Sequence, residues 1–559
     1  MLSGRYAPNT GFEGAGGDGG AKGKSVKVFP SDQPLLPATL KAAGYATVMA
    51  GKWHIGFARP MDTPEGRGFD EFLGMPRRRR IYTVSGQTNL FPRHALSDAT
   101  LSAGYFEGGE DYFDHTLGAA CGRHDVHDLW YGLASGGKSR PAVQPARSRT
   151  YSTELYSEFI VRHVLANNNS RPLFVYAAFQ GVHFPLQVPQ RFFDRYNAQG
   201  AGAECRWDKQ TLSKGGFPSG FTCLPDPQYN SSQEHAAHDC SCNRLIVKAQ
   251  VSALSEGVGN ITAALKKMTM WARTILVFMG DNGGPNDGGH SNAPRRGGKL
   301  NFFEGGVRPA AFVASPLLSK RSQGTVFDGM VHEVDWFATF ASVAQATLPA
   351  KLDGVNFWPT LLDPTTPHRS EVLIADKVVR VGNFKLVAGG SRGADPRNWY
   401  SSQLKGCMLG TSGGWMVPSN SSASSCPGDR YTSGGCASCL GCPEDPRTVN
   451  AVTSAVDLWL CSDPCTDASP CLWDVVADPN ELNEIAKSNP AVVSRMLSRL
   501  HALQANFSNG TGGSGELVDN GRFCEVLNST EVAGFGVFVA PWMPDPAPAA
   551  GGRASSTGC

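Results

Sequence analysis

Short runs of consecutive apolar residues alternate with amphipathic stretches over much of the chain. Three of these runs, at 45–50, 172–179 and 274–279, predict strands that are buried on both faces. Residues 309–315 are a further candidate strand. Between the second and third runs, a long amphipathic helix is predicted by an apolar stripe formed by Val247, Val251, Leu254, Val258, Ile261 and Leu265. Because helices and strands alternate, we expect an α/β domain with a mostly parallel sheet flanked by helices.

The pattern changes in the C-terminal part of the chain. Predicted strands become shorter there, as at 379–387, and the loops are rich in Cys, Gly and Ser. A late amphipathic helix is predicted from Pro490, a residue that suits the first helical position. We therefore expect a large domain at 1–365, a smaller Cys-rich domain at 366–535 and a disordered Pro-, Ala- and Gly-rich tail at 536–559.

Composition excludes several classes of protein. Of the 559 residues, 41% are hydrophobic and 18% are charged, which excludes a wholly disordered chain. The net charge of +2 gives no indication of nucleic-acid binding. No run of about 18 apolar residues occurs, so we expect no membrane-spanning helix.

The fifteen cysteines are concentrated near the C-terminus, with ten of them in the segment 407–559. Cys436, Cys439 and Cys442 follow a C-x2-C-x2-C spacing, which suits either a structural zinc site or disulfides formed in an oxidising compartment. Seven N-x-[ST] sequons occur, at Asn168, Asn230, Asn260, Asn420, Asn506, Asn509 and Asn528. Together these features favour disulfides and a glycoprotein of the secretory pathway, extracellular or lysosome-like, although residues 1–10 contain no apolar signal-peptide segment.

Polar side chains follow three of the predicted strands. The first strand leads into Lys52 and His54, the second into His183, and the third into Asp281 and Asn282. In an open parallel sheet the ligand site lies beyond the carboxyl ends of the strands, so we expect these side chains to gather. Each feature alone has a simpler explanation, since Asp-Asn-Gly-Gly is typical of a turn, His183 of a half-buried histidine and Lys52 of a surface charge. Their joint appearance at strand ends favours a chemical role.

The residue types indicate which chemistry to expect. A carboxylate and an amide carbonyl are hard oxygen ligands that suit Ca²⁺ or Mg²⁺. Lysine and histidine cations, to which Lys299 adds one further along the chain, suit a multiply charged oxyanion such as sulfate or phosphate. A histidine can also protonate a leaving alkoxide. The combination predicts metal-assisted hydrolysis of an anionic ester.

Four segments carry a family resemblance. Residues 44–56 read G-Y-A-T-V-M-A-G-K-W-H-I-G and resemble the second sulfatase signature, G-Y-x-T-x-x-x-G-K-W-H-L-G. The segments H-x-P-L-x-x-P from His183, D-N-G-G at 281–284 and K-x-x-x-x-E-G-G-x-R at 299–308 are similar to further sulfatase motifs. The chain is accordingly identified as a member of the sulfatase family, most similar to the arylsulfatase B type, which includes N-acetylgalactosamine-4-sulfatase.

The resemblance implies a fold and a site. It implies an alkaline-phosphatase-like α/β fold over 1–365 and a smaller C-terminal α+β domain that carries an antiparallel sheet. It implies one Ca²⁺ ion, with Asp281 and Asn282 among its ligands. It implies that four cationic residues bind the sulfate of an aryl or carbohydrate sulfate ester and handle protons, namely Lys52, His54, His183 and Lys299.

Two parts of the family pattern are missing. Sulfatases attack sulfur with a formylglycine hydrate made from the Cys or Ser of C/S-x-P-S-R-x-x-x-L-T-G-R, and paired aspartates supply further metal ligands. Met1 to Arg5 look like the end of that motif, whereas no C/S-x-P-S-R and no Asp-Asp pair occurs in the sequence. We therefore expect an N-terminal truncation, with the formylglycine, the first strand and a signal peptide upstream. The chain as written is expected to be inactive, and its neighbouring strands to have an open edge.

Two other interpretations stay open. The chain is either such a hydrolase or a non-catalytic relative that binds sulfated glycans. A phosphoesterase of the same superfamily, with a Ser or Thr nucleophile, is disfavoured by the sulfatase-type G-K-W-H-x-G motif. The expected ligand is a sulfated small molecule or a sulfated glycan, whose identity depends on the predicted insertions at 76–150 and 200–243. The sequence does not indicate the oligomeric state.

Overall fold

The structure of the protein is a computed structural model. It describes residues 1–12, 25–75, 126–127, 129–134, 140–141, 151–183, 188–196, 240–284, 290–292, 294–299, 302–389, 465–507, 516–519, 531–532 and 536–538. Most of the two predicted insertions and the C-x2-C-x2-C segment lie outside these residues.

The central sheet has five strands in the order β6–β5–β3–β2–β7. Their bounds are β2 Ala46–Lys52, β3 Glu71–Met75, β5 Trp130–Leu133, β6 Arg140–Pro141 and β7 Leu173–Ala178. β2 lies in the middle and pairs in parallel with β3 and β7, whereas β5 and β6 extend the sheet in the antiparallel sense. Gly51 allows β7 to approach, because a Cβ there would lie 1.9 Å from the carbonyl oxygen of Ala178. The strands predicted at 45–50 and 172–179 are thereby confirmed.

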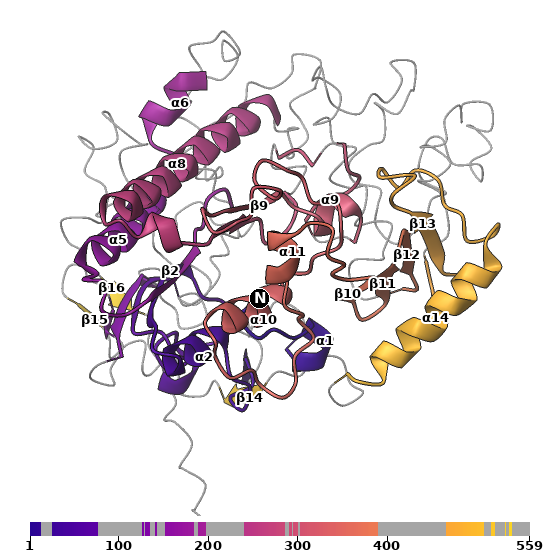
Figure 1. Ribbon diagram of the computed structural model, residues 1–559, viewed down its shortest axis with the longest axis horizontal. Helices are drawn as coiled ribbons and strands as arrows, with labels where there is room; N and C mark the ends of the chain where they lie inside the picture. Colours follow the sequence, from indigo (N-terminus) through magenta and orange to yellow (C-terminus); the bar gives the residue numbers. More distant parts are fainter. Residues whose placement is uncertain are drawn as a thin grey trace, which may run out of the picture.

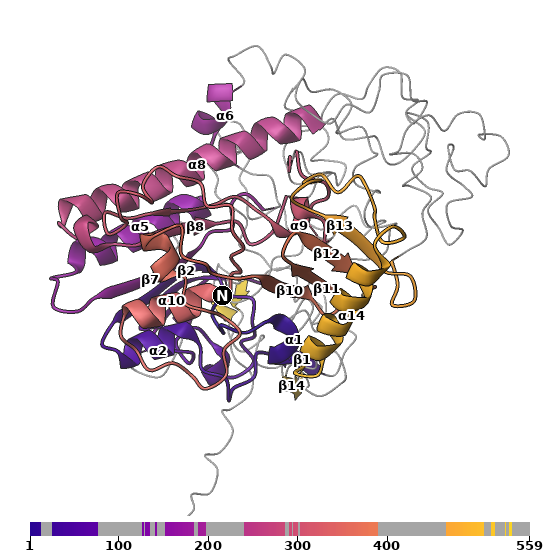
Figure 2. The same cartoon turned by 45° about the vertical axis from the view of Figure 1, so that its right-hand side comes forward.

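Helices cover both faces of this sheet (Figures 1 and 2). On one face α5 (Ser152–Ala166) lies beside α8 (Cys240–Lys267), and this layer packs on Val48 and Ala50 of β2. The other face is covered by two helices that pack against each other, α2 (Leu36–Ala42) and α10 (Asp335–Val343). The alternation of side chains along β2 therefore explains why its whole run is apolar.

The predicted long helix is confirmed as α8, and Leu254 and Leu265 of the predicted stripe are buried, but the buried face also includes residues outside that stripe. Val251 is 48% exposed, whereas Ala249 and Ala253 are buried. These two alanines pack against Phe192 of α6 (Gln190–Tyr196). Small side chains allow α6 to approach α8 closely. A pattern based on large apolar residues does not identify this alanine face.

β7 and β8 are more exposed than the sequence predicts. β8 (Leu276–Met279) pairs antiparallel with β9 (Ala311–Ala314) in a separate two-stranded sheet, so the described sheets are mixed rather than mostly parallel. Within the described part of the chain, β7 pairs only with β2, and Ala177 is exposed. The prediction that both strands are fully buried is wrong, because every residue of β7 and β8 is partly buried or exposed.

The C-terminal sheet has four antiparallel strands in the order β10–β11–β12–β13. Their bounds are β10 Glu371–Ala375, β11 Val378–Val381, β12 Phe384–Val387 and β13 Cys471–Asp474. The single strand predicted at 379–387 is wrong, because a turn at Gly382, with φ of +55°, divides it into β11 and β12. The predicted late helix is confirmed as α14 (Pro490–Gln504), which packs on this sheet through Met496 and Leu500. Cys465 and Cys471 form a disulfide at the start of β13.

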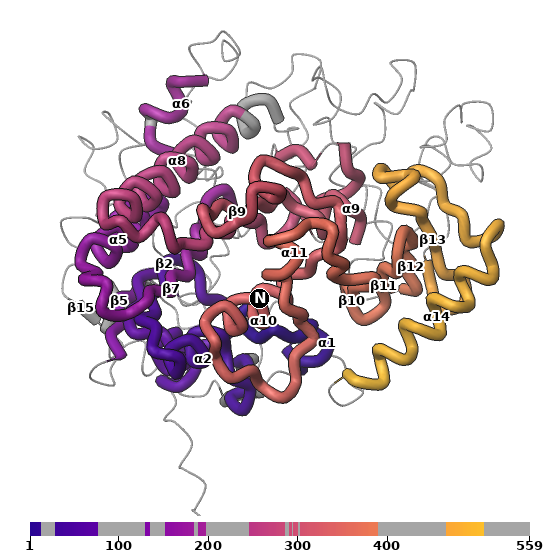
Figure 3. The backbone as a smooth tube through the Cα atoms, in the orientation of Figure 1, coloured from indigo at the N-terminus to yellow at the C-terminus, as the bar shows by residue number. Residues whose placement is uncertain are grey.

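Several shorter elements complete the described structure. They are α1 Ala7–Thr10, β1 Ser25–Val28, η1 Pro60–Asp62, β4 Val126–His127, η3 Trp271–Arg273, α9 Glu304–Val307, α11 Trp358–Leu362, β14 Glu516–Asp519, β15 Glu531–Val532 and β16 Gly536–Phe538. The N-terminal residues lie near α10 (Figure 3), and the carbonyl of Gly4 accepts from the N–H of Asp353 at 2.9 Å. β14 pairs with β1, and β16, which lies in the segment predicted as a tail, pairs with β4. The division into domains stays a prediction. None of the described helices is long and apolar enough to span a membrane.

The open edge of β7 predicts self-association. Replacing Ala177 by Lys adds a charge where a second strand would pair, so we expect less dimer and aggregate than in the wild type by sedimentation velocity. The matched control, Ala166→Lys at the exposed end of α5, should leave self-association unchanged. Equal self-association of the Ala177→Lys variant and the wild type would contradict a contact through β7.

An ion pair joins α5 to the start of β3. His163 Nε2 lies 2.8 Å from Glu71 Oε2, and His163 Nδ1 lies 2.8 Å from the carbonyl oxygen of Phe159. Both ring nitrogens face oxygen acceptors, which favours the doubly protonated imidazolium. Burial lowers the pKa of His163, but the hydrogen bonds to Glu71 and Phe159 outweigh burial and raise this pKa above its ordinary value. Burial raises the pKa of Glu71, but hydrogen bonds from His163 and Tyr131 outweigh it and leave this pKa lowered.

These shifts predict how stability depends on pH. The contribution of His163 is fully present below its unfolded pKa of about 6.5 and is lost as the pH rises through its raised folded pKa. We expect the free energy of unfolding, measured in urea, to fall by about 1 kcal/mol between pH 6 and pH 8 from this pair. The His163→Gln variant should show a flatter pH dependence over that interval. An unchanged pH dependence in the variant would exclude the ion pair as its source.

Candidate functional site

The carboxyl ends of the parallel strands β2, β3 and β7 lie side by side, and we call this the carboxyl edge of the central sheet. Lys52 is the last residue of β2 and pairs with Met75, the last residue of β3. Gln180 follows β7, and its side-chain amide contacts the Met75 sulfur. The N–H of His183 donates to the carbonyl of Gln180 at 2.8 Å. His54 lies two residues beyond Lys52 in a left-handed conformation, with φ of 60°. The segments that carry Lys52, His54 and His183 are therefore neighbours, as predicted from the sequence.

A second cluster of loops follows β8. The N–H of Gly283 donates to the carbonyl of Gly306 at 2.8 Å, and the N–H of Lys299 donates to the carbonyl of Gly284 at 3.3 Å. Asn292 ties these turns together, because its side chain accepts from the N–H of Gly284 at 2.9 Å and donates to the carbonyl of the same residue at 2.8 Å. The loop that carries Asp281 and Asn282 is thus bonded directly to the segment that carries Lys299.

The two clusters meet through His290. Its Nε2 lies 3.0 Å from the carbonyl oxygen of Val182, which places the loop after β8 against the loop after β7. Burial, followed by the charges of Glu333 and Asp281, raises the pKa of Tyr176 on β7. Asp281 is therefore within electrostatic reach of the strand that leads to His183. A hydrogen bond thus connects the loop after β8 to the loop after β7, although β8 belongs to a different sheet.

The site residues differ in exposure. The carboxylate-bearing residue, Asp281, is exposed, whereas Lys52, His54, His183, Asn282 and Lys299 are partly buried. All six residues therefore keep some solvent-accessible surface. Lysine and histidine cations can bind an oxyanion, and histidines can transfer protons.

The donor set for a metal fits calcium in kind but not in number. Asp281 offers a carboxylate and Asn282 an amide carbonyl, while the Asn282 amide nitrogen donates to the carbonyl of Gly283 at 2.9 Å. Calcium takes about six to eight oxygen ligands. Among the described residues, no group of three or more His, Cys, Asp or Glu side chains is placed to hold a metal ion. Further ligands must therefore come from elsewhere if these two residues bind Ca²⁺.

Two features of the site were not found from the sequence. Asn292 belongs to no pattern of apolar spacing, and only side-chain hydrogen bonds such as those to Gly284 and Gly297 reveal its role. Gln180 is also not indicated by the sequence, because it follows the end of β7 but its side chain carries no charge. Both residues hold loops in place, and neither is charged. Only charged or metal-binding residue types at strand ends indicate chemistry in a sequence, so these two do not stand out.

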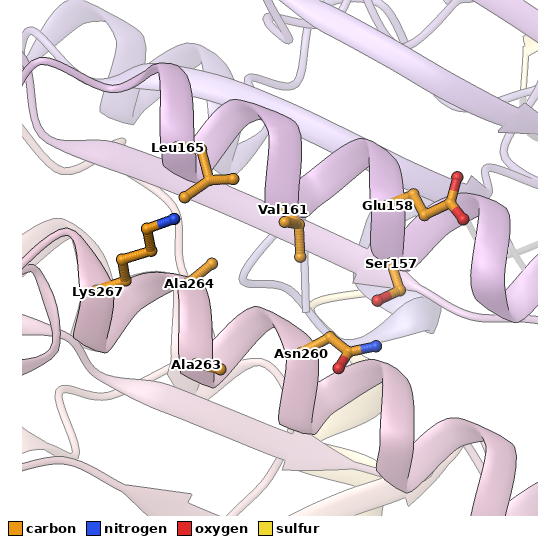
Figure 4. A pocket seen from close by; sticks show the side chains of 8 residues that line it. All are labelled: Ser157, Glu158, Val161, Leu165, Asn260, Ala263, Ala264 and Lys267. Carbon is orange, nitrogen blue, oxygen red and sulfur yellow. The ribbon is translucent and has the colours of Figure 1, made fainter.

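A separate cavity of about 350 Å³ lies between α5 and α8 (Figure 4). It is lined by Ser157, Glu158, Val161, Leu165, Asn260, Ala263, Ala264 and Lys267. None of the candidate site residues lines it. The cavity lies in the helix layer rather than at the carboxyl ends of the strands, so its size does not make it the functional site.

The chain belongs to the sulfatase family, since the Sulfatase family model matches residues 1–346. It is 28% identical to mouse (Mus musculus) arylsulfatase J over 378 residues, which cover 67% of the chain and 49% of that relative. It is 23% identical to human (Homo sapiens) N-acetylgalactosamine-6-sulfatase over 361 residues, 62% of the chain and 53% of that relative. The chain thus spans about half the length of these relatives.

Solved structures share the fold. A crystal structure of Ps i-CgsB in complex with k-i-k-neocarrahexaose has a TM-score of 0.55 at 20% identity and covers 91% of this chain and 82% of that one. The PsFucS1 sulfatase from Pseudoalteromonas sp. has a TM-score of 0.52 at 16% identity and covers 91% and 80%. The predicted alkaline-phosphatase-like fold and the predicted membership in a family of sulfuric ester hydrolases are confirmed. The similarity to the arylsulfatase B type stays a prediction.

The contact between the two loops of the site predicts a local steric effect. A Cβ at Gly283 would lie 1.7 Å from the carbonyl oxygen of Gly305, so Gly283→Ala should lower the free energy of unfolding by about 1–3 kcal/mol. The matched control is Gly259→Ala on α8, where a Cβ meets nothing within 4 Å. That change should raise stability by about 0.5–1 kcal/mol through helix propensity. Urea unfolding of both variants measures the difference, and equal effects would contradict the close contact.

Proposed function

We propose that this chain carries the ligand site of a calcium-dependent sulfatase that removes sulfate from aryl or carbohydrate sulfate esters. The observation that supports this most is the meeting of the β2, β7 and β8 loops at one edge of the sheet. The segments that meet there carry four cationic residues and two oxygen donors. A sulfate ester needs both, because its oxygens carry the negative charge and its leaving oxygen needs a proton.

Each residue has a proposed role. Lys52 and Lys299 bind the sulfate oxygens, and His54 and His183 bind sulfate and move protons to or from the ester. Asp281 and Asn282 would hold Ca²⁺. When bound, the ion would supply positive charge that orients the sulfate and polarises its sulfur–oxygen bonds.

The nucleophile is proposed to be a formylglycine, as the family resemblance implies. No C/S-x-P-S-R motif occurs within the 559 residues. A polypeptide of these residues alone should therefore bind sulfate esters without forming the covalent intermediate that turnover requires.

The relatives support a carbohydrate substrate. They include an N-acetylgalactosamine-6-sulfatase and a fold neighbour bound to a neocarrahexaose. We propose a sulfated glycan or a sulfated small molecule as the ligand, with N-acetylgalactosamine 4-sulfate as the first compound to test.

We also propose that the protein is a glycoprotein of the secretory pathway. The Cys465–Cys471 disulfide supports an oxidising compartment. Three of the sequon asparagines, Asn168, Asn260 and Asn506, are exposed and therefore accessible to glycans.

The proposed function predicts binding without turnover. Titration calorimetry with N-acetylgalactosamine 4-sulfate in the presence of Ca²⁺ should detect binding by the 559-residue chain, whereas a release assay should detect no sulfate. Lys299→Ala removes a charged contact and should weaken binding about 10-fold or more. Chelation of calcium should weaken it as well.

The matched control is Lys267→Ala, which changes a lysine of the α5–α8 cavity and should leave the affinity unchanged. Sulfate release by this chain would refute the missing-nucleophile argument. Equal affinities of the Lys299→Ala variant and the wild type would refute the proposed site. Hydrolysis of p-nitrophenyl phosphate would favour a phosphoesterase instead.

A further inference from the structure

A cluster of buried charges lies between the C-terminal sheet and α9; we call it the Lys385 cluster, after its central residue. Lys385 on β12 has no exposed side-chain surface. Its Nζ lies 3.1 Å from Glu304 Oε1, forms an ion pair with Glu481 and donates to the carbonyl of Phe302 at 2.8 Å. Figures 1 and 2 both place α9 beside β12 and β13. Three segments distant in sequence therefore meet at one ammonium group.

Arg296 completes the cluster. Its Nη1 donates to the carbonyl of Glu481 at 2.7 Å, and its guanidinium lies 4.0 Å from the centre of the Phe303 ring. Burial lowers the pKa of Arg296 to about 10, which leaves it charged at neutral pH. Arg308 Nη1 and Arg380 Nη1 also lie 3.6 and 3.8 Å from Glu304 Oε2, so several cations surround the buried carboxylates of Glu304 and Glu481.

Such a cluster is not explained by stability alone. Desolvation of buried charges offsets much of their attraction, and well-packed apolar side chains often stabilise a protein as much or more. Directional ion pairs do, however, specify one arrangement of the groups that they join. The place of this cluster in the fold is therefore a better guide to its role than its contribution to the free energy of unfolding.

The cluster is attached to the candidate site through the backbone. Glu481 accepts from the N–H of Glu304 at 2.6 Å, which holds the first residue of α9. The N–H of Gly305 then donates to the carbonyl of Arg296 at 2.7 Å. From α9 the path continues to the 281–284 loop, where the carbonyl of Gly306 accepts from Gly283. Lys299 lies between the two attachment points, and its own N–H is bonded to that loop.

We propose that Lys385 and Glu481 are positioning residues, through which the C-terminal sheet holds Asp281, Asn282 and Lys299 in place for the sulfate-ester ligand. The identity of the ligand rests on the proposed function. The mechanical coupling between the Lys385 cluster and the loops at 281–284 and 296–308 does not depend on the proposed function.

Hydrogen–deuterium exchange of the whole 559-residue chain tests the coupling. In Lys385→Met and in Glu481→Gln, exchange of peptides covering 281–284 and 296–308 should rise 10-fold or more. Peptides from β2 and β7 should exchange as in the wild type. Glu481→Gln keeps the shape of the side chain, so it serves if Lys385→Met does not fold. The matched control is Glu371→Gln, which breaks an exposed ion pair with Arg499 on the same C-terminal sheet and should change neither loop.

A second measurement relates the coupling to the ligand. The affinity for N-acetylgalactosamine 4-sulfate in the presence of Ca²⁺ should fall about 10-fold in both cluster variants and stay unchanged in Glu371→Gln. Exchange that rises equally in β2 and β7, or in no segment, would overturn the positioning role. If exchange rises only in the two loops of the variants, but the wild-type protein binds no sulfated sugar, the coupling is supported and the proposed function is refuted.

Discussion

Parallel pairing of β2 with β3 and β7 is the constraint on which the candidate site depends. The carboxyl ends of parallel strands lie on the same side of a sheet, so residues that follow different strands become neighbours although they are far apart in the sequence. Gly51 makes the pairing with β7 possible, since any larger residue would meet the carbonyl of Ala178. The segments that carry Lys52, His54 and His183 are neighbours for this reason.

The third strand end reaches the site by a different route. β8 pairs with β9 and not with β7 in the described part of the chain, so no sheet register places Asp281 beside His183. Hydrogen bonds connect the loop after β8 to the loop after β7 instead, through His290 and Asn292. A site built partly on a sheet edge and partly on loops needs additional support, and the C-terminal sheet supplies it through Lys385.

Charge is arranged differently in two parts of the described structure. Lys52, His54, His183 and Lys299 at the strand ends are partly buried, whereas Lys385 is fully buried and is paired with the carboxylates of Glu304 and Glu481. A buried cation that is paired with carboxylates fixes the geometry of the groups around it. Under the proposed function, the same residue types serve ligand binding at one place and fixed geometry at another.

Local pattern and motif spacing determined the strands at 45–50 and 172–179, the helices α8 and α14 and the sulfatase motifs, because each depends on residues close together in the chain. Tertiary structure alone decided the exposure of β7 and β8, the division of 379–387 into two strands and the buried alanine face of α8. It also decided the roles of Asn292, Gln180, Lys385 and Glu481. Burial and hydrogen-bond partners depend on which distant segments pack together, and no short stretch of sequence contains that information.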